Sequence, residues 1–281
     1  MKIDTICVLG AGNMGNGIAQ VGACAGYNII LFDIASLQLE KAKATIQKSL
    51  TKLEEKKKLS APASQILSAI KFTSTLTDVK TSQFVIEAAT ERRDLKFKLF
   101  KDLDEMMAKD VVLATNTSSI SITEIASHTR RAEKVAGMHF MNPVPIMLLV
   151  EGIRGLATSD EAFSTVRTVA EKMGKTFIEA KDAPGFAVNR ILMPMINEAF
   201  FALNENLASA KDIDQAMKLG CNFPMGPLEL ADFVGIDVCL FVCEILHRDL
   251  GDSKYRPSPL MRKYVEAGWF GRKTGRGVYT Y

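Results

Sequence analysis

The sequence predicts an α/β protein in which a Rossmann-type, mainly parallel, doubly wound sheet precedes a second, all-helical C-terminal domain. Two observations carry this prediction. Apolar strand-like runs alternate with helical stretches through residues 1–184, and only helical patterns follow from residue 185 to residue 281. A third observation is the glycine-rich turn directly after the first apolar run, which is typical of the first βαβ unit in nucleotide-binding sheets.

The expected elements of the first domain follow in order. Strands are predicted at residues 6–9, 28–32, 71–73, 84–88, 111–115, 135–139, 148–153 and 176–180. Helices are predicted at residues 14–25, 36–58, 95–107 and 160–173. The breaker cluster Asp-Ala-Pro-Gly at 182–185 then ends the alternation. In the second domain we expect helices at residues 188–203, 210–219, 228–234, 238–249 and 259–267.

Composition narrows the class of protein. A net charge of +3 over 281 residues is too small to favour nucleic-acid binding. No apolar run approaches the length of a membrane span, and the first ten residues already form a strand pattern instead of a signal peptide. The five cysteines are scattered and odd in number, which favours reduced thiols and a cytoplasmic location.

One cysteine pattern could bind a metal ion. Cys239, Cys243 and His247 recur every fourth residue, so a helix would place all three on one face. The surrounding run is strongly apolar, a setting in which free cysteine behaves as a small hydrophobe, and a fourth ligand is missing nearby. We therefore predict no metal site.

The glycine turn Gly10-Ala11-Gly12-Asn13-Met14-Gly15 predicts an NAD site. Gly10 permits the tight turn, Gly12 lets backbone amides approach a pyrophosphate, and Gly15 lets the helix pack close to the strand. The helix predicted to begin at Met14, directly after Asn13, offers its positive N-terminus to the phosphates. Asp33 closes the next strand, where its carboxylate would accept hydrogen bonds from ribose hydroxyls and repel a 2′-phosphate. The alternative is a glycine-rich turn in an unrelated βαβ unit.

Two further segments supply candidate catalytic groups. His139 ends one predicted strand and Glu151 lies in the next, so the two side chains can meet across a short connection. A carboxylate on one ring nitrogen fixes the tautomer and stabilises the imidazolium, which leaves the other nitrogen as a general base. Ser118 follows another strand, at the edge where open α/β sheets bind ligands. The alternatives are a structural histidine at 139 and a helix-capping serine at 118.

These motifs together resemble the L-3-hydroxyacyl-CoA dehydrogenase family, and within it the short, single-function bacterial 3-hydroxybutyryl-CoA dehydrogenases. The resemblance covers nearly the whole chain and has one visible departure, Leu148, where the family often has lysine. It rests on the glycine turn, Asn116-Thr117-Ser118-Ser119, His139-Phe140-Met141-Asn142-Pro143-Val144-Pro145, Pro184-Gly185-Phe186-x-x-Asn189-Arg190, Pro224-Met225-Gly226-Pro227 and the tail at 271–277.

The resemblance implies roles for individual residues. His139 would be the catalytic base and Glu151 its partner, while Ser118 and Asn189 would bind the reacting oxygen and the substrate carbonyl. Further residues would line the NAD site: Asp33, Glu91, Lys96, Asn142 and Lys273. Two residues of the long helix after Asp33 would contact coenzyme A: Ser49 and Lys56. Without the family, Lys96 and Lys273 would be interpreted as exposed lysines, and Asn189 as a residue that caps or starts a helix.

The implied activity is the interconversion of (S)-3-hydroxyacyl-CoA, in particular 3-hydroxybutyryl-CoA, and 3-ketoacyl-CoA with NAD(H). A dehydrogenase of the 6-phosphogluconate type would need a lysine where this chain has Gly185. An L-gulonate-type sugar-acid dehydrogenase, a related structural lens crystallin and an NAD-binding sensor remain as alternatives. The basic residues at 48–58 favour a coenzyme A thioester over a sugar acid, although a solvated helix face would show the same pattern.

The second domain, residues 185–281, carries more apolar side chains than a unit of its size can bury alone, so we expect it to form a homodimer; the alternative is that these side chains face the first domain. The residues on which this expectation rests are Met193, Met195, Phe200, Phe201, Phe233 and Phe241. The resemblance implies that this domain also binds substrate.

Overall fold

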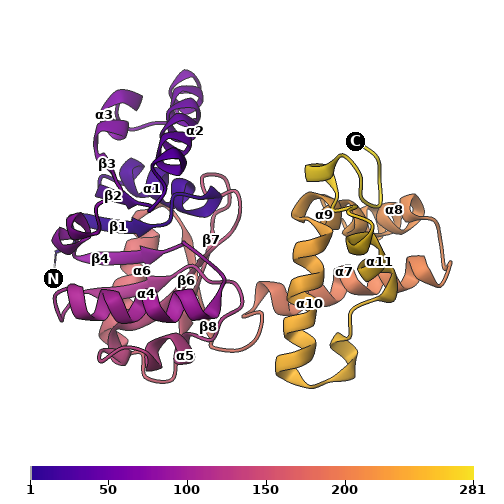
Figure 1. Cartoon of the computed structure of the whole chain (residues 1–281). Coiled ribbons are helices and arrows are strands. Elements are labelled where there is room, and N and C mark those ends of the chain that lie inside the picture. Colours follow the sequence, from indigo (N-terminus) through magenta and orange to yellow (C-terminus); the bar gives the residue numbers. More distant parts are fainter. Residues whose placement is uncertain (1) are drawn as a thin grey trace. The chain divides into compact units, whose positions relative to one another are not determined.

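The structure, a computed structural model, describes residues 2–281 and separates into two compact units (Figure 1). The first unit ends at Ala183 and the second spans Pro184–Tyr281. Within residues 2–281, no helix combines the length and the apolarity needed to cross a bilayer.

The first unit contains one eight-stranded sheet with the order β3-β2-β1-β4-β5-β6-β7-β8. Strands β1 to β6 run parallel in the order found in dinucleotide-binding sheets, while β7 is antiparallel to β6 and β8 is parallel to β7. The predicted fold class is thus confirmed. The strands are β1 (Thr5–Leu9), β2 (Asn28–Phe32), β3 (Ile70–Thr73), β4 (Phe84–Glu87), β5 (Val112–Thr115), β6 (Val135–Phe140), β7 (Leu149–Arg154) and β8 (Thr176–Lys181).

Helices cover both faces of this sheet (Figure 1). Three of them share one apolar core, to which Ile18, Ile46 and Phe163 contribute: α1 (Asn13–Cys24), α2 (Ser36–Glu55) and α6 (Asp160–Lys172). The short helix α3 (Ala63–Ser68) packs beside α2, whereas α4 (Arg93–Met106) and α5 (Ile122–Ser127) bury other apolar residues, among them Phe100 and Ile125. Because β1, β4 and β5 run parallel and are covered on both faces, they are mostly apolar, although β4 ends on Glu87 and β5 on Thr115.

Two differences from the predicted elements concern helices. Helix α2 ends at Glu55, short of the predicted end at Lys58, because Lys57 adopts a positive φ of 53° that a helix cannot continue. The short helices α3 and α5 were not predicted, since six residues are too few to show a helical period.

The second unit is entirely helical apart from isolated bridges in its tail. Its helices are α7 (Val188–Asn204), α8 (Ala210–Gly220), α9 (Pro227–Val234), α10 (Ile236–Leu250) and α11 (Pro259–Glu266). They enclose a separate apolar core in which Met193 and Phe200 are buried. The prediction that these two residues supply surplus surface is therefore wrong, whereas Phe233 and Phe241 are about half exposed, at 48% and 46%.

Candidate active site

The glycine turn leaves β1 and enters α1 in the way a dinucleotide requires. Gly10 has a φ of +96°, and a Cβ atom there would lie 2.6 Å from the Ala88 carbonyl oxygen. A Cβ atom on Gly15 would lie 1.7 Å from the Gly10 carbonyl oxygen, so only glycine allows this approach of helix and strand. Gly12 faces open space, since a Cβ atom added there would have no neighbouring atom within 4 Å. The residues thus fit a pyrophosphate over Gly12, at the N-terminus of α1.

Asp33 lies directly after β2 and borders the glycine turn. Its carboxylate accepts hydrogen bonds from the backbone N–H groups of Ala11, at 2.8 Å, and Ala35, at 2.9 Å. These bonds fix the carboxylate beside the turn, and each oxygen retains a lone pair for a further donor. The position therefore fits a ribose with free hydroxyls and disfavours an additional phosphate.

His139 and Glu151 form a buried pair across the only antiparallel step of the described sheet. They lie directly opposite each other on β6 and β7, and His139 Nδ1 is 2.7 Å from Glu151 Oε2. Glu151 is completely buried and His139 is 7% exposed. A carboxylate can only accept a hydrogen bond, so Nδ1 donates and Nε2 is the nitrogen that can accept a proton. The sequence predicted that these side chains would meet, and they do.

Ser118 is held at the carboxyl edge of the same sheet by Glu91. The Glu91 carboxylate accepts hydrogen bonds from the backbone N–H and the hydroxyl of Ser118, at 2.8 and 3.1 Å, and from the Thr117 hydroxyl at 2.7 Å. Helix α5 is capped by Ser121, so Ser118 does not serve as its cap. Glu91, predicted for the NAD site, here orders the loop that carries a predicted catalytic serine.

Sequence reasoning assigned no role to Asn116 or Glu87. The Asn116 side-chain oxygen accepts a 2.8 Å hydrogen bond from the backbone N–H of Phe140, which ties the loop after β5 to the residue next to His139. Glu87 is fully buried and accepts hydrogen bonds from the Thr115 hydroxyl and the Ala89 N–H. The sequence does contain a signal for Glu87: it is an acidic residue at the end of an otherwise apolar strand, where a buried charge needs a partner.

Lys96 is buried beneath these loops, so its interpretation as an exposed lysine is wrong. It is 1% exposed, and its ammonium group pairs with the Glu87 carboxylate. Its Nζ also lies 3.4 Å from the Thr115 hydroxyl oxygen. Its predicted role at the NAD site remains a prediction.

The remaining predicted residues of the first unit lie at three separate places. Asn142 is exposed in the connection between β6 and β7, before a cis peptide bond to Pro143. Ser49 is half-buried on α2, where its hydroxyl accepts a 2.9 Å hydrogen bond from the Gln20 amide of α1. Lys56 is exposed immediately after the end of α2. Leu148 is also exposed, as expected for a residue that replaces a surface lysine.

Asn189 and Lys273 belong to the second unit. Asn189 is the second residue of α7, and no side chain caps that helix. Lys273 lies in the tail after α11, where its Nζ is 2.6 Å from the Asp237 carboxylate. Lys273 is thus ion-paired within its own unit and roughly half exposed.

The cysteine pattern of α10 faces the apolar core. Cys239 and Cys243 are buried, whereas His247 on the same helix is exposed. Burial and the nearby Glu244 raise the pKa of the Cys243 thiol to about 12, and burial likewise raises that of Cys239. Both environments disfavour the thiolate that a metal would require.

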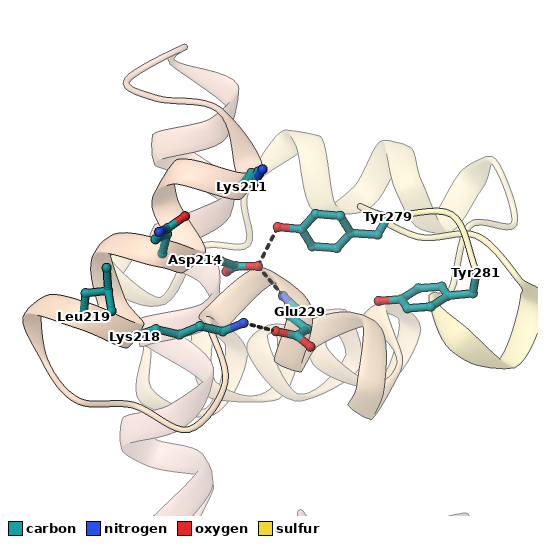
Figure 2. A pocket seen from close by; sticks show the side chains of 8 residues that line it. Lys211, Asp214, Lys218, Leu219, Glu229, Tyr279 and Tyr281 are labelled. Carbon is teal, nitrogen blue, oxygen red and sulfur yellow. Dashed lines mark hydrogen bonds and ion pairs between the residues drawn. The ribbon is translucent and has the colours of Figure 1, made fainter.

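A hollow of about 500 Å³ in the second unit is lined by none of the predicted site residues (Figure 2). Asp214 at its base accepts hydrogen bonds from the Tyr279 hydroxyl and from the N–H groups of Leu228 and Glu229. Lys218 pairs with Glu229 across the hollow at 2.6 Å. These contacts fasten the C-terminal tail to the start of α9, so the hollow is a feature of tail packing.

Comparison with known proteins decides the family. The profile of the 3-hydroxyacyl-CoA dehydrogenase NAD binding domain matches residues 5–183, and that of the 3-hydroxyacyl-CoA dehydrogenase C-terminal domain matches residues 185–281. The chain belongs to the 3-hydroxyacyl-CoA dehydrogenase family. It is therefore an NAD-dependent oxidoreductase, and the predicted family, enzyme class and cofactor are confirmed.

Members of this family resemble the chain over its full length. A probable 3-hydroxybutyryl-CoA dehydrogenase of Bacillus subtilis is 50% identical, covering 100% of this chain and 98% of the relative. The human mitochondrial hydroxyacyl-coenzyme A dehydrogenase is 41% identical over 99% of this chain and 91% of its own length. The crystal structure of an (S)-3-hydroxybutyryl-CoA dehydrogenase from Ralstonia eutropha is 52% identical, with a TM-score of 0.96, and covers 100% of this chain and 99% of that one.

Proposed function

We propose that this enzyme interconverts (S)-3-hydroxybutyryl-CoA and acetoacetyl-CoA with NAD(H), and that His139 is its catalytic base. The observation that carries the proposal is the buried His139–Glu151 pair, in which Nδ1 and Oε2 are 2.7 Å apart. His139 lies on β6, which pairs with β5, and the loop after β5 bears Ser118. The names of full-length relatives at about 50% identity support the substrate class. NAD, when bound, accepts or supplies the hydride.

The chain's own residues handle the proton and the orientation of the substrate. His139 Nε2 takes the proton of the 3-hydroxyl group during oxidation and returns it during reduction. Glu151 stabilises the imidazolium that forms, because its buried carboxylate lies against the other ring nitrogen. Ser118 and Asn189 bind the substrate oxygens, and the glycine turn with Asp33, Glu91, Lys96, Asn142 and Lys273 holds the cofactor.

The coenzyme A moiety is proposed to lie along the end of α2. Lys56 is exposed there and belongs to a basic stretch that includes Lys52 and Lys57. Lysine ammonium groups bind the phosphate groups of coenzyme A well. A small sugar acid has no phosphate groups and would not require such a cluster of lysines. Ser49 would add a hydroxyl contact on the same helix.

A paired substrate assay tests the proposed activity against the alternative activity, that of an L-gulonate-type dehydrogenase. We expect purified enzyme to oxidise NADH with acetoacetyl-CoA and to reduce NAD with (S)-3-hydroxybutyryl-CoA. L-gulonate with NAD should give no comparable turnover. Turnover of L-gulonate in place of the thioester would overturn the proposal, and cofactor binding without turnover of either would support a sensor.

We also propose a homodimer formed through the second unit, and a cytoplasmic location. Exposed apolar side chains of the second unit support the former. The five cysteines, all free in the structure, support the latter.

A further inference from the structure

An unusual buried cation lies beneath the connection between the two strands that carry His139 and Glu151. Lys175 follows α6 and is only 7% exposed, although lysine is almost never buried unless it is paired. Within residues 2–281, no carboxylate lies at ion-pair distance from its ammonium group. Instead Nζ donates hydrogen bonds to two backbone carbonyl oxygens, those of Val144 at 2.5 Å and Met147 at 2.8 Å.

Both carbonyls belong to the 142–148 turn, by which we mean the residues that connect β6 to β7. Within this turn, the N–H groups of Ile146 and Met147 both donate to the Pro143 carbonyl. The Val144 and Met147 carbonyls accept from Lys175 instead. The backbone N–H of Thr176 adds a bond to the Leu148 carbonyl at 2.8 Å. Charge-assisted bonds to the turn, made from one buried side chain, fix its position more firmly than neutral ones would.

The opposite side of the 142–148 turn packs against the helix of the glycine turn. Val144 is 2% exposed, and a Cβ atom placed on Gly17 of α1 would lie 2.8 Å from the Val144 Cβ atom. The turn is therefore held between the Lys175 ammonium group and the backbone of α1. Asn142, which the proposed function assigns to the NAD site, is its first residue.

We propose that Lys175 is a positioning residue for the cofactor site, because it holds the 142–148 turn, and with it Asn142, against helix α1. Lys175 does not touch the reacting atoms. It acts by fixing the backbone that carries Asn142 and that joins the His139 strand to the Glu151 strand. Burial lowers the pKa of Lys175 from its ordinary value, and the two carbonyl contacts offset that loss of hydration for the charged form. The inference rests on the proposed function, since it assumes that Asn142 faces NAD.

The variant Lys175→Met keeps most of the buried volume and removes the charge and both hydrogen bonds. We expect its NADH dissociation constant, measured by fluorescence titration of the free enzyme, to rise about tenfold, the order expected when a binding group is misplaced. The KM for acetoacetyl-CoA should stay within about twofold, because the proposed coenzyme A contacts, Ser49 and Lys56, lie on α2 and immediately after its end. Hydrogen exchange at the amides of Ile146 and Met147 should quicken.

Arg131→Met provides the matched control. Arg131 is another buried cation of the same unit, 5% exposed, and it donates to the backbone carbonyls of Asp104 and Met107 far along the chain from the turn. This variant should lower the melting temperature but leave NADH affinity within about twofold of the original enzyme. If Lys175→Met fails to fold, Lys175→Gln replaces it; its amide can donate to one carbonyl, so an intermediate loss of NADH affinity is expected.

The outcomes separate this inference from the proposed function. Unmodified enzyme that binds no NADH would contradict the proposed function itself. Unmodified enzyme that binds NADH, together with a folded Lys175 variant of unchanged NADH affinity, would overturn the positioning role alone. Weaker NADH binding without faster exchange at Ile146 and Met147 would also overturn it, because the turn would then not be the intermediary.

Discussion

At the scale of single residues, the proposed chemistry depends on a few side chains whose surroundings leave little freedom. His139 has one ring nitrogen committed to Glu151 by direct cross-strand pairing, and the Ser118 hydroxyl is ordered by Glu91. Asp33 is fixed beside the glycine turn by two backbone amides. Substitutions at these positions should therefore change the reaction or the cofactor more than they change the fold.

Replacing His139 with Gln should lower turnover about a hundredfold or more, the usual contribution of a general base, while NADH binds almost as before. Glu151→Gln should lower turnover by a smaller factor, because the imidazole base remains and only its charged partner is removed. Steady-state rates and NADH titrations measure both effects. His128→Gln is the matched control, because His128 is exposed and stacks on Phe97. Near-normal turnover of the His139 variant would show that another group is the base.

Asp33 should set the preference for NAD over NADP, since its carboxylate would repel a 2′-phosphate. In Asp33→Ala we expect the ratio of kcat/KM values for the two cofactors to narrow, mainly through weaker NAD binding. Loss of the two hydrogen bonds that Asp33 accepts should also loosen the glycine turn. Comparable kcat/KM values of the unmodified enzyme for NAD and NADP would contradict the role of Asp33 in cofactor preference.

At the scale of elements, short connections and helix ends decide where the functional groups lie. Helix α2 stops at Glu55, so Lys56 projects from its end and Lys57 turns away from the helical path. The loop before β6 is held by Arg131, whose guanidinium group pairs with Asp104 at 2.8 Å. Each of these arrangements leads to a measurable consequence.

Lys56→Ala should raise the KM for acetoacetyl-CoA about threefold to fivefold with little change in kcat, because an exposed lysine–phosphate contact is screened by water and salt. Activity on the N-acetylcysteamine thioester, which has no phosphates, should not change. Lys101→Ala, which removes an exposed lysine from α4, is the control. Equal loss on both thioesters would mean that Lys56 supports the fold instead of the ligand.

Asp104 should make part of the stability depend on acid pH. Burial raises the pKa of Asp104, but hydrogen bonds from the Arg131 side chain and the Arg130 backbone, together with both charges, outweigh it and hold the pKa below its ordinary value. A carboxyl with a lowered pKa in the folded state contributes stability above its unfolded pKa and loses it as the pH falls through the folded value.

Asp104→Asn should therefore reduce the free energy of unfolding at pH 7 by about 1.5–3 kcal/mol, the range for hydrogen bonds to charged groups. The difference from the unmodified protein should shrink below about pH 4 as Asp104 becomes protonated there too. Urea unfolding at several pH values measures this. Asp102→Asn, which breaks an exposed pair with Lys98, should change stability by less than about 0.5 kcal/mol. A pH-independent difference would contradict the assignment.

At the scale of the whole molecule, the second unit buries its own core and still exposes large apolar side chains. They include Ile191, Leu207, Leu219, Phe233, Val238 and Phe241. Exposed apolar surface of this kind is characteristic of subunit interfaces.

The expected homodimer can be tested on Val238 and Phe241, which are 42% and 46% exposed and one turn apart on α10. The double substitution of both by Ser should shift sedimentation at micromolar concentration from dimer toward monomer. Leu156→Ser, which alters a 90% exposed leucine of the first unit, should leave the dimer intact. A compact monomer of the unmodified protein would refute the prediction.

The sequence by itself determined the alternating architecture, the cofactor class and the pairing of His139 with Glu151. Local patterns suffice for these features, because glycine spacing, strand runs and breaker residues act over short stretches of chain. Only the tertiary structure decided that Lys96 is buried on Glu87, that Glu91 holds Ser118, and that Met193 and Phe200 belong to a core. Lys175 is the clearest case. Its partners are backbone carbonyls about thirty residues earlier in the chain. Every residue has a backbone carbonyl, so the sequence does not indicate which of them a buried lysine binds.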